Sequence, residues 1–375
     1  MIVYKKEETA VTKRSIYRGC LLGLAVGDAM GCGIDERSFD EIQEDYGPGG
    51  LRGYDLVNGY ADVSSHTQLA AFTCNGLLLA MTRGQLRGAM APLSRYIALA
   101  QKEWMQGQRH FANRNATRCW VYQHPVMRQR RCMDTRMLET LSMEAAGTLE
   151  EPLNRYVNPG SLTTAIPVGL FGGLNILPPE ETLRLAAESV ALTSGGQKAF
   201  LSGAILAGVI QMLTEDPRQP MKKVFTEAAN RVREQFGGEY PQVEELCNYL
   251  RHALSLADQP QITAPEAMDR LECKTAGQVL AGVAYACVAC NRDFDAAMII
   301  AVNHSGRSSA VAALTGAILG AALGEEEIQN FYLDCLEPVS ILRTLADDLL
   351  QGCPMDRRGG IFDDDWNQKY VHGGV

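Results

Sequence analysis

The stretch Asn303–Ala322 reads NHSGRSSAVAALTGAILGAA, a short polar turn followed by a run of almost purely small residues. Gly316 and Gly320 lie four residues apart, so both face the same side of a helix and allow another backbone to approach closely. Glycine costs roughly 1 kcal/mol relative to alanine inside a helix. Two of them therefore predict a buried helix that contacts a neighbouring element through its glycines.

The polar entry to this helix holds Ser305, Gly306, Ser308 and Ser309 around Arg307. Serine hydroxyls and free N–H groups at a helix start favour an anion. The planar guanidinium of arginine suits a phosphate or a carboxylate. The alternative interpretation is a capped core helix with a solvated arginine, and the stretch alone leaves both open.

A second small-residue stretch, Ser15–Met30, reads SIYRGCLLGLAVGDAM. Gly19, Gly23 and Gly27 recur every four residues, which predicts a tightly packed helix. Asp28 lies near the C-terminal end of this helix, where the helix dipole disfavours a carboxylate. We therefore expect Asp28 to have a specific partner or to face a polar cavity, with a solvated carboxylate as the alternative.

The composition excludes several classes of protein. The chain has 375 residues, 46% of them hydrophobic, and a net charge of −9, which disfavours binding to nucleic acid or to an anionic membrane through overall charge. The opening residues are polar, unlike a secretory signal, and no apolar run approaches the ~20 residues that span a bilayer. These features predict a soluble cytoplasmic protein.

The segment Gln108–Arg131 is basic, and its arginines alternate with Phe111, Trp120 and Tyr122. Basic and aromatic residues together can bind nucleic acid. In an acidic protein we interpret this single segment as a solvated insertion or a protein contact.

Helical spacing recurs along the chain, for example in Phe39–Tyr46, Gly88–Trp104 and Asp134–Glu150, whereas strand alternation is weak. No long linker divides the chain. We predict a compact, single-domain all-α bundle over residues 15–350, preceded by a polar lead at 1–14. A tail follows at 351–375, solvated except for a docked Trp366.

Three segments together resemble the ADP-ribosylglycohydrolase family: RGCLLGLAVGDAMG at 18–31, SSHTQLAAFT at 64–73 and AVNHSGRSSAVAALTGAILGA at 301–321. Their order and spacing agree with the family, and the likeness runs over roughly Ser15 to Gly324. The resemblance implies an all-α fold that cleaves ADP-ribose from acceptors such as arginine or serine with two magnesium ions.

The sequence departs from the family at the metal motifs. Ser64–Thr67 stand where the family has T-D-D-T, and Gly306–Ala310 stand where it has G-D-x-D-[ST]. Both carboxylates of each motif are replaced, by hydroxyls, an imidazole and a guanidinium. Magnesium prefers anionic oxygen ligands in octahedral geometry. We therefore expect no metal ligands and no cofactor here.

Three hypotheses follow. The first is a metal-free pseudoenzyme that binds an ADP-ribose-like or other nucleotide or glycosidic ligand. The second is a hydrolase that uses acid–base chemistry instead of metal, with Asp28, Asp62 and His66 as catalytic candidates. The third is an interaction protein with a closed cleft and a protein partner. The candidate ligand-binding residues are Ser64, Ser65, His66, Thr67, Asn303, His304, Gly306, Arg307, Ser308 and Ser309.

Overall fold

The computed structural model describes residues 11–88, 91–109, 117–131, 133–358 and 360–374. Within these ranges the regular elements are helices, and two isolated β-bridges join Val57 to Tyr60 and Ala61 to Leu336. The α-helices are α1 (Lys13–Cys32), α2 (Phe39–Tyr46), α3 (Ser65–Arg87), α4 (Leu93–Gln108), α5 (Pro125–Arg128), α6 (Thr135–Leu141), α7 (Ala165–Gly172), α8 (Pro179–Ala191), α9 (Gln197–Glu215), α10 (Met221–Phe236), α11 (Val243–Leu256), α12 (Ala264–Arg270), α13 (Ala276–Ala289), α14 (Phe294–Val302), α15 (Ser308–Leu323), α16 (Asn330–Asp334), α17 (Val339–Gln351) and α18 (Asp364–Tyr370). Short 3₁₀ helices are η2 (Trp120–Gln123), η3 (Pro159–Thr164) and η4 (Glu325–Glu327). The predicted all-α, single-domain fold is confirmed.

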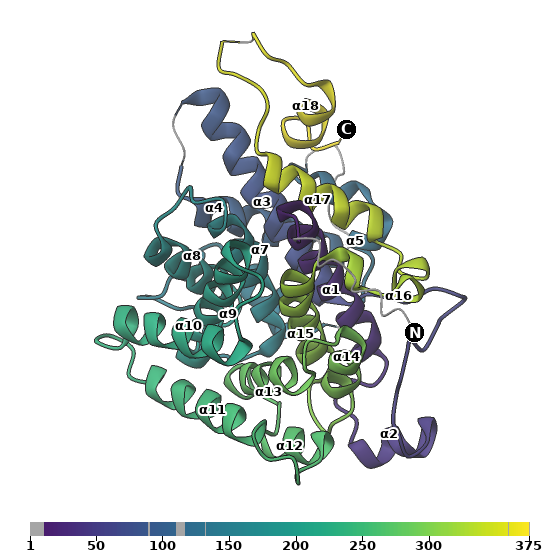
Figure 1. The fold of residues 1–375 in the computed structure, drawn as a ribbon. Coiled ribbons are helices and arrows are strands. Elements are labelled where there is room, and N and C mark those ends of the chain that lie inside the picture. The colour runs from purple at the N-terminus through teal and green to yellow at the C-terminus, as the bar shows by residue number, and fades with distance from the viewer. Residues whose placement is uncertain (1–10, 89–90, 110–116, 132, 359, 375) are drawn as a thin grey trace, which may run out of the picture.

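The helices α1 and α15 lie side by side near the middle of the molecule (Figure 1). They run antiparallel, because Gly19 and Gly23 of α1 face Gly320 and Gly316 of α15, respectively. A Cβ at Gly23 would lie 2.7 Å from the carbonyl carbon of Gly316 and closer still to its oxygen. Backbone therefore meets backbone along this contact, which confirms the packing role predicted for the glycines.

The antiparallel pair brings three helix ends together. At the C-terminal end of α1, a Cβ at Gly31 would lie 2.5 Å from Cα of Ser309 at the start of α15. The start of α3 joins them, because the backbone N–H of Ser64 donates to Asp28 of α1 at 2.8 Å. The C-terminal end of α1 and the N-terminal ends of α3 and α15 therefore lie close together, although they come from distant parts of the sequence.

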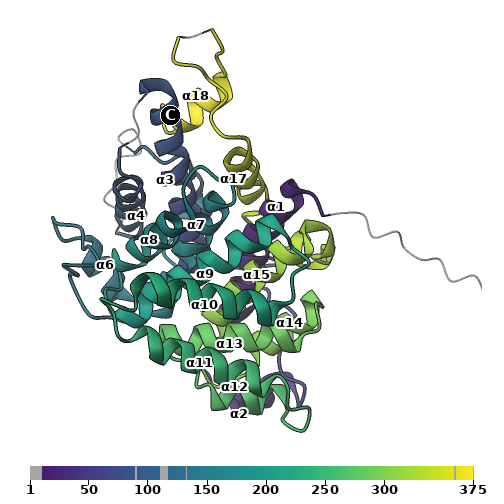
Figure 2. The same cartoon turned by 60° about the vertical axis from the view of Figure 1, so that its left-hand side comes forward.

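The other helices enclose this centre. Helix α9 packs against α7, α8, α10 and α13, and α17 packs against α1 and α3. Helix α18 lies at one end of the molecule, whereas α2 and α12 lie at the other end in both views (Figures 1 and 2). In the described ranges, no helix combines the length and apolar character needed to cross a bilayer.

The chain after α17 folds back onto the body. The ring of Trp366 is buried, and its Nε1 donates to Oγ1 of Thr82 at 2.9 Å. Lys369 Nζ and the Tyr370 hydroxyl each lie 2.6 Å from Oδ2 of the buried Asp348. The docking predicted for Trp366 is confirmed, and the residues around it form helix α18, which the sequence interpretation had not predicted.

Two sequence predictions fall partly outside the described ranges. Residues 1–10 of the predicted N-terminal lead lie outside them. The predicted lead extends to residue 14, but α1 already begins at Lys13. Residues 110–116 of the basic segment Gln108–Arg131 also lie outside the described ranges. In the described part of that segment, Glu103 accepts the backbone N–H groups of Arg118 and Cys119 at 2.7 and 2.8 Å.

Candidate functional site

Asp28 is fully buried and organises the first turn of α3. It accepts the backbone N–H groups of Ser64 and Thr67 at 2.8 and 3.0 Å, and the hydroxyls of the same two residues at 2.5 and 2.6 Å. Burial by itself raises the pKa of Asp28, but hydrogen bonds from His66, Ser64 and Thr67 outweigh it and the pKa is lowered. The expectation that Asp28 has specific partners is confirmed, and it is an ionised cap.

His66 is held by this carboxylate. Its Nδ1 lies 3.2 Å from Oδ1 of Asp28 and 3.0 Å from Oγ of Ser64. Because an ionised carboxylate only accepts hydrogen bonds, Nδ1 of His66 is the donor in this pair, and Nε2 takes no part in it. A Cβ at Gly160 would lie 3.0 Å from Nε2, so this atom packs closely against Gly160, and both residues line the cavity described next. An imidazole oriented by a carboxylate is suited to general-base chemistry.

A cavity of about 490 Å³ opens beside His66. This volume lies within the range of about 300–1,000 Å³ that is usual for small-molecule sites. The walls come from the end of α1 and the residues after it, and from the starts of α3, α6, η3 and α15. The lining residues are Cys32, Asp35, Glu36, Ser64, Ser65, His66, Met133, Asp134, Thr135, Arg136, Met137, Asn158, Gly160, Arg307 and Ser309.

Arg307 forms one wall of this cavity and is already paired with two carboxylates. Its Nε lies 3.1 Å from Oδ2 of Asp35, and its Nη1 lies 2.7 Å from Oε1 of Glu36. Asp35 also accepts the backbone N–H of Ser309 at 3.0 Å and so caps α15. Glu36 has a positive φ of 66°, an uncommon conformation for a residue with a side chain. Much of the charge of Arg307 is thus neutralised within the protein.

Another part of the wall is built around Asp134, which caps α6. It accepts the backbone N–H of Arg136 at 2.9 Å and Nδ2 of Asn158 at 2.7 Å. Burial raises the pKa of Asp134, but its hydrogen bonds from Arg136 outweigh that effect and lower it. Arg136 also lies over the ring of Tyr156, at 5.1 Å from the centroid. This wall is therefore a second ion pair whose members face the cavity.

Half of the ten predicted ligand-binding residues line this cavity, namely Ser64, Ser65, His66, Arg307 and Ser309. The other five have structural partners. Thr67 binds Asp28, Asn303 binds both backbone groups of Leu51, His304 binds Ala301, Ser308 binds Val302, and Gly306 packs against Glu272 and Cys273. Among the catalytic candidates, Asp28 lies behind His66, whereas Asp62 lines a different cavity.

Sequence reasoning missed the charged residues Asp35, Glu36, Asp134 and Arg136, and also Asn158. For Asp134 a signal was present, because an aspartate directly before a helical pattern is a typical N-cap. Asp35 and Glu36 follow a glycine-rich turn without any repeating pattern. Their role depends on the contact between α1 and α15, which brings Arg307 to them.

His304 gives the molecule a pH-dependent stability. It is fully buried, and burial lowers its pKa from 6.5 to about 4. Below pH 6.5 the unfolded chain therefore binds a proton that the folded chain does not, so stability falls as the pH drops from 6.5 towards 4. We expect this group to reduce the free energy of unfolding by about 2 kcal/mol between pH 7 and pH 5.

The measurement is urea unfolding of the protein and of His304→Leu at both pH values. The variant should lose less stability on acidification, because leucine binds no proton. An equal loss in both proteins would show that another group is responsible.

Comparison with known proteins agrees with this fold. A solved structure described as "ADP-ribosylglycohydrolase-related protein complex" is similar with a TM-score of 0.56 and 20% sequence identity, over 90% of this chain and 98% of that chain. At this identity the likeness supports the helical fold alone. No curated protein matches the chain. The family model described as ADP-ribosylglycohydrolase matches residues 9–359. The chain therefore belongs to the ADP-ribosylglycohydrolase family.

Proposed function

We propose that the protein binds an ADP-ribose-like or related nucleotide or glycosidic ligand in the cavity beside His66, without the two magnesium ions that the family uses. One observation carries the proposal. Ser65, His66, Arg307 and Ser309, which stand at the carboxylate positions of the two family motifs, all line this one cavity. We infer that the cavity still accepts a ligand, although the four family carboxylates are replaced here by other side chains.

The donors at these positions do not fit two divalent cations. They are two hydroxyls, one imidazole and one guanidinium, and Arg307 brings a permanent positive charge. At about 4 Å and an effective dielectric constant of 20, two unit charges interact by about 4 kcal/mol. Asp35 is bound to Arg307 and the start of α15, and Glu36 is bound to Arg307. In the part of the chain that the structure describes, no three His, Cys, Asp or Glu residues are arranged to hold a metal ion.

The polar lining suits the ribosyl part of such a ligand. The carboxylates of Asp35, Glu36 and Asp134 can accept hydrogen bonds from sugar hydroxyls. Arg307 has its Nη2 outside both of its ion pairs, and this group can meet an anionic part of the ligand. Three carboxylates face the cavity with only two guanidinium groups, those of Arg136 and Arg307. We therefore expect the ribose to contribute more to binding than the phosphates.

A second candidate function is hydrolysis of a glycosidic bond without metal. The observation that favours it is the pairing of Asp28 with Nδ1 of His66, which leaves Nε2 to accept a proton from water. The third hypothesis, a closed cleft, has less support. A cavity of about 490 Å³ remains beside Arg307, whose side chain forms its wall.

Calorimetric titration with ADP-ribose tests the binding proposal. We expect equal affinity in buffer with magnesium and in buffer with a chelator. We expect Arg307→Ala to bind about tenfold more weakly, because a hydrogen bond to a charged group contributes about 1.5–3 kcal/mol. Arg184→Ala is a matched control, since Arg184 is also paired with two carboxylates, Glu150 and Glu188, but lies outside this cavity.

Two results would contradict the proposal. One is about two bound magnesium ions per chain in metal analysis of the purified protein. The other is an absence of ADP-ribose binding by the unaltered protein at millimolar concentration. Release of ADP-ribose from a modified arginine or serine peptide in chelator, lost in His66→Asn, would select hydrolysis over binding alone.

A further inference from the structure

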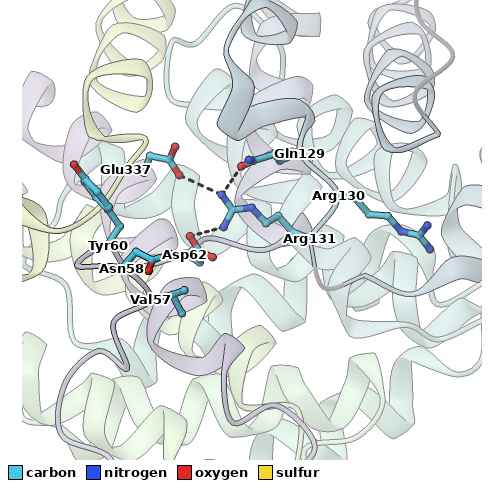
Figure 3. A pocket seen from close by; sticks show the side chains of 8 residues that line it. All are labelled: Val57, Asn58, Tyr60, Asp62, Gln129, Arg130, Arg131 and Glu337. Atoms are coloured by element: carbon cyan, nitrogen blue, oxygen red, sulfur yellow. Dashed lines mark hydrogen bonds and ion pairs between the residues drawn. The ribbon is translucent and has the colours of Figure 1, made fainter.

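Figure 3 shows the residues that line a second cavity, of about 680 Å³. Its lining residues are Val57, Asn58, Tyr60, Asp62, Gln129, Arg130, Arg131 and Glu337. Asp62, one of the three catalytic candidates, belongs here and not beside His66. The cavity therefore needs an explanation separate from the proposed ligand site.

A rigid turn forms one side of this cavity. The backbone groups of Val57 and Tyr60 are bonded to each other in both directions, at 2.9 and 3.1 Å. Asn58 and Gly59 between them both have positive φ, 53° and 84°, as the tightest hairpin turns require. The turn therefore presents Val57 and Tyr60 in a fixed position before anything binds.

A single bridge joins two distant segments at the cavity. The N–H of Ala61 donates to the carbonyl of Cys335 at 2.9 Å, and Ala61 pairs with Leu336 in parallel. The residues that follow, Asp62 and Glu337, are therefore neighbours. Their carboxylates both reach the guanidinium of Arg131, at 2.5 and 3.2 Å, as Figure 3 shows.

The cluster of Asp62, Glu337 and Arg131 carries a net negative charge, although Arg130 also lines the cavity. The side chain of Arg131 is only 13% exposed, whereas those of Asp62 and Glu337 are 46% and 39% exposed. The one guanidinium lies beneath two carboxylates, so this cluster keeps one uncompensated negative charge. Figure 3 shows the other cation, Arg130, extending away from the cluster.

An aromatic face stands beside these carboxylates. Tyr60 is 58% exposed and lines the same cavity as Asp62 and Glu337. A cation over an aromatic ring gains about 0.5–1 kcal/mol at an exposed site. Exposed carboxylates and an exposed ring on a rigid turn together favour a guanidinium or ammonium group on a flexible chain.

The two cavities are lined by residues that lie close together in the sequence. Asp62 lines this cavity and Ser64 lines the first, and likewise Arg131 lines this cavity and Met133 the first. Two residues of extended chain span at most about 7 Å. A polypeptide whose modified residue occupies the first cavity therefore has its neighbouring residues within reach of the second.

We propose that this second cavity binds an arginine or lysine side chain of a partner polypeptide, through Glu337, Asp62 and the ring of Tyr60. This side chain is distinct from any residue that carries an ADP-ribosyl group. The net charge of −9 on the whole chain supports the approach of a basic partner. That the partner also presents its modified residue to the first cavity rests on the proposed function, whereas binding of the cationic side chain does not.

The test uses the full-length protein and two fluorescent pentapeptides that differ at one position, arginine or its neutral isostere citrulline. We expect the arginine peptide to bind, more weakly as salt is raised, and the citrulline peptide to bind at least about fivefold more weakly. Glu337→Gln should lower the affinity for the arginine peptide by up to about fivefold, the usual effect of losing an exposed ion pair. Tyr60→Ala should lower the same affinity by about two- to fivefold, because the cation–π contact is lost.

Glu239→Gln, an exposed carboxylate elsewhere on the surface, should leave peptide binding unchanged. Equal binding of the arginine and citrulline peptides, or equal binding by Glu337→Gln and the unaltered protein, would overturn the inference. Preference for a phosphorylated acidic peptide would also overturn it. Titration of ADP-ribose into the unaltered protein separates the two proposals: if ADP-ribose fails to bind but binding of the arginine peptide still depends on Glu337, only the proposed function falls.

Discussion

Replacing Gly23 with alanine is expected to destabilise the protein by about 3 kcal/mol or more, at the upper end of the usual cost of overpacking. The added Cβ would meet the carbonyl carbon of Gly316 at 2.7 Å, and its oxygen more closely still. Both atoms belong to the backbone of α15, so no side chain can rotate away. Leucine at the same position should prevent folding, because α1 and α15 cannot then stay in contact. Urea unfolding followed by circular dichroism measures both effects.

Gly33 offers a control at the end of the same helix. A Cβ there would meet nothing within 4 Å, and the residue has an ordinary φ of −71°. Gly33→Ala should therefore change the free energy of unfolding by no more than about 0.5 kcal/mol. If Gly23→Ala and Gly33→Ala had equal free energies of unfolding, that result would contradict the close backbone contact between α1 and α15 at Gly23.

Asp348→Leu is expected to cost about 3–5 kcal/mol, the usual effect of removing one member of a buried ion pair. Asp348 and Lys369 are only 8% and 7% exposed, and Asp348 also accepts the hydroxyl of Tyr370 at 2.6 Å. Without this carboxylate, the buried Lys369 keeps only its pairing with the exposed Asp365, at 2.8 Å, and α18 should detach. The measurements are urea unfolding and the rate of proteolysis within residues 352–374.

Two further variants sharpen this test. Asp347 precedes Asp348 but pairs with Arg14 and Arg18 at the surface, so Asp347→Leu should cost only about 1 kcal/mol. Adding Lys369→Met to Asp348→Leu should restore much of the lost stability, since no charge is then buried. Similar losses for Asp347→Leu and Asp348→Leu would argue that α18 is held by apolar contacts alone.

The helical framework could be predicted because its signals are local. Ser38 and Glu41 form a capping box, and α2 spans the predicted Phe39–Tyr46. Predictions failed where one residue changed the backbone. Helix α4 begins only after Pro92, and α6 ends at Leu141, where the hydroxyl of Ser142 donates to the carbonyl of Glu139.

The site was less predictable, because polar residues close in sequence have different partners in space. Asn303 was assigned to ligand binding with its neighbours, yet it bonds both backbone groups of Leu51, far away along the chain. Arg307 remains a predicted ligand contact, but its pairing with Asp35 and Glu36 was not predicted. Nothing in a linear pattern indicates which distant backbone or carboxylate will become a partner.

The pairing of α1 with α15 has a consequence for biosynthesis. Roughly 275 residues separate the end of α1 from the start of α15. At about 5–20 residues per second, the ribosome needs roughly 14–55 s to deliver the partner helix. During that interval the glycine-lined face of α1 has no partner of its own. Nascent chains should therefore depend on chaperones that shield their first helix until translation is nearly complete.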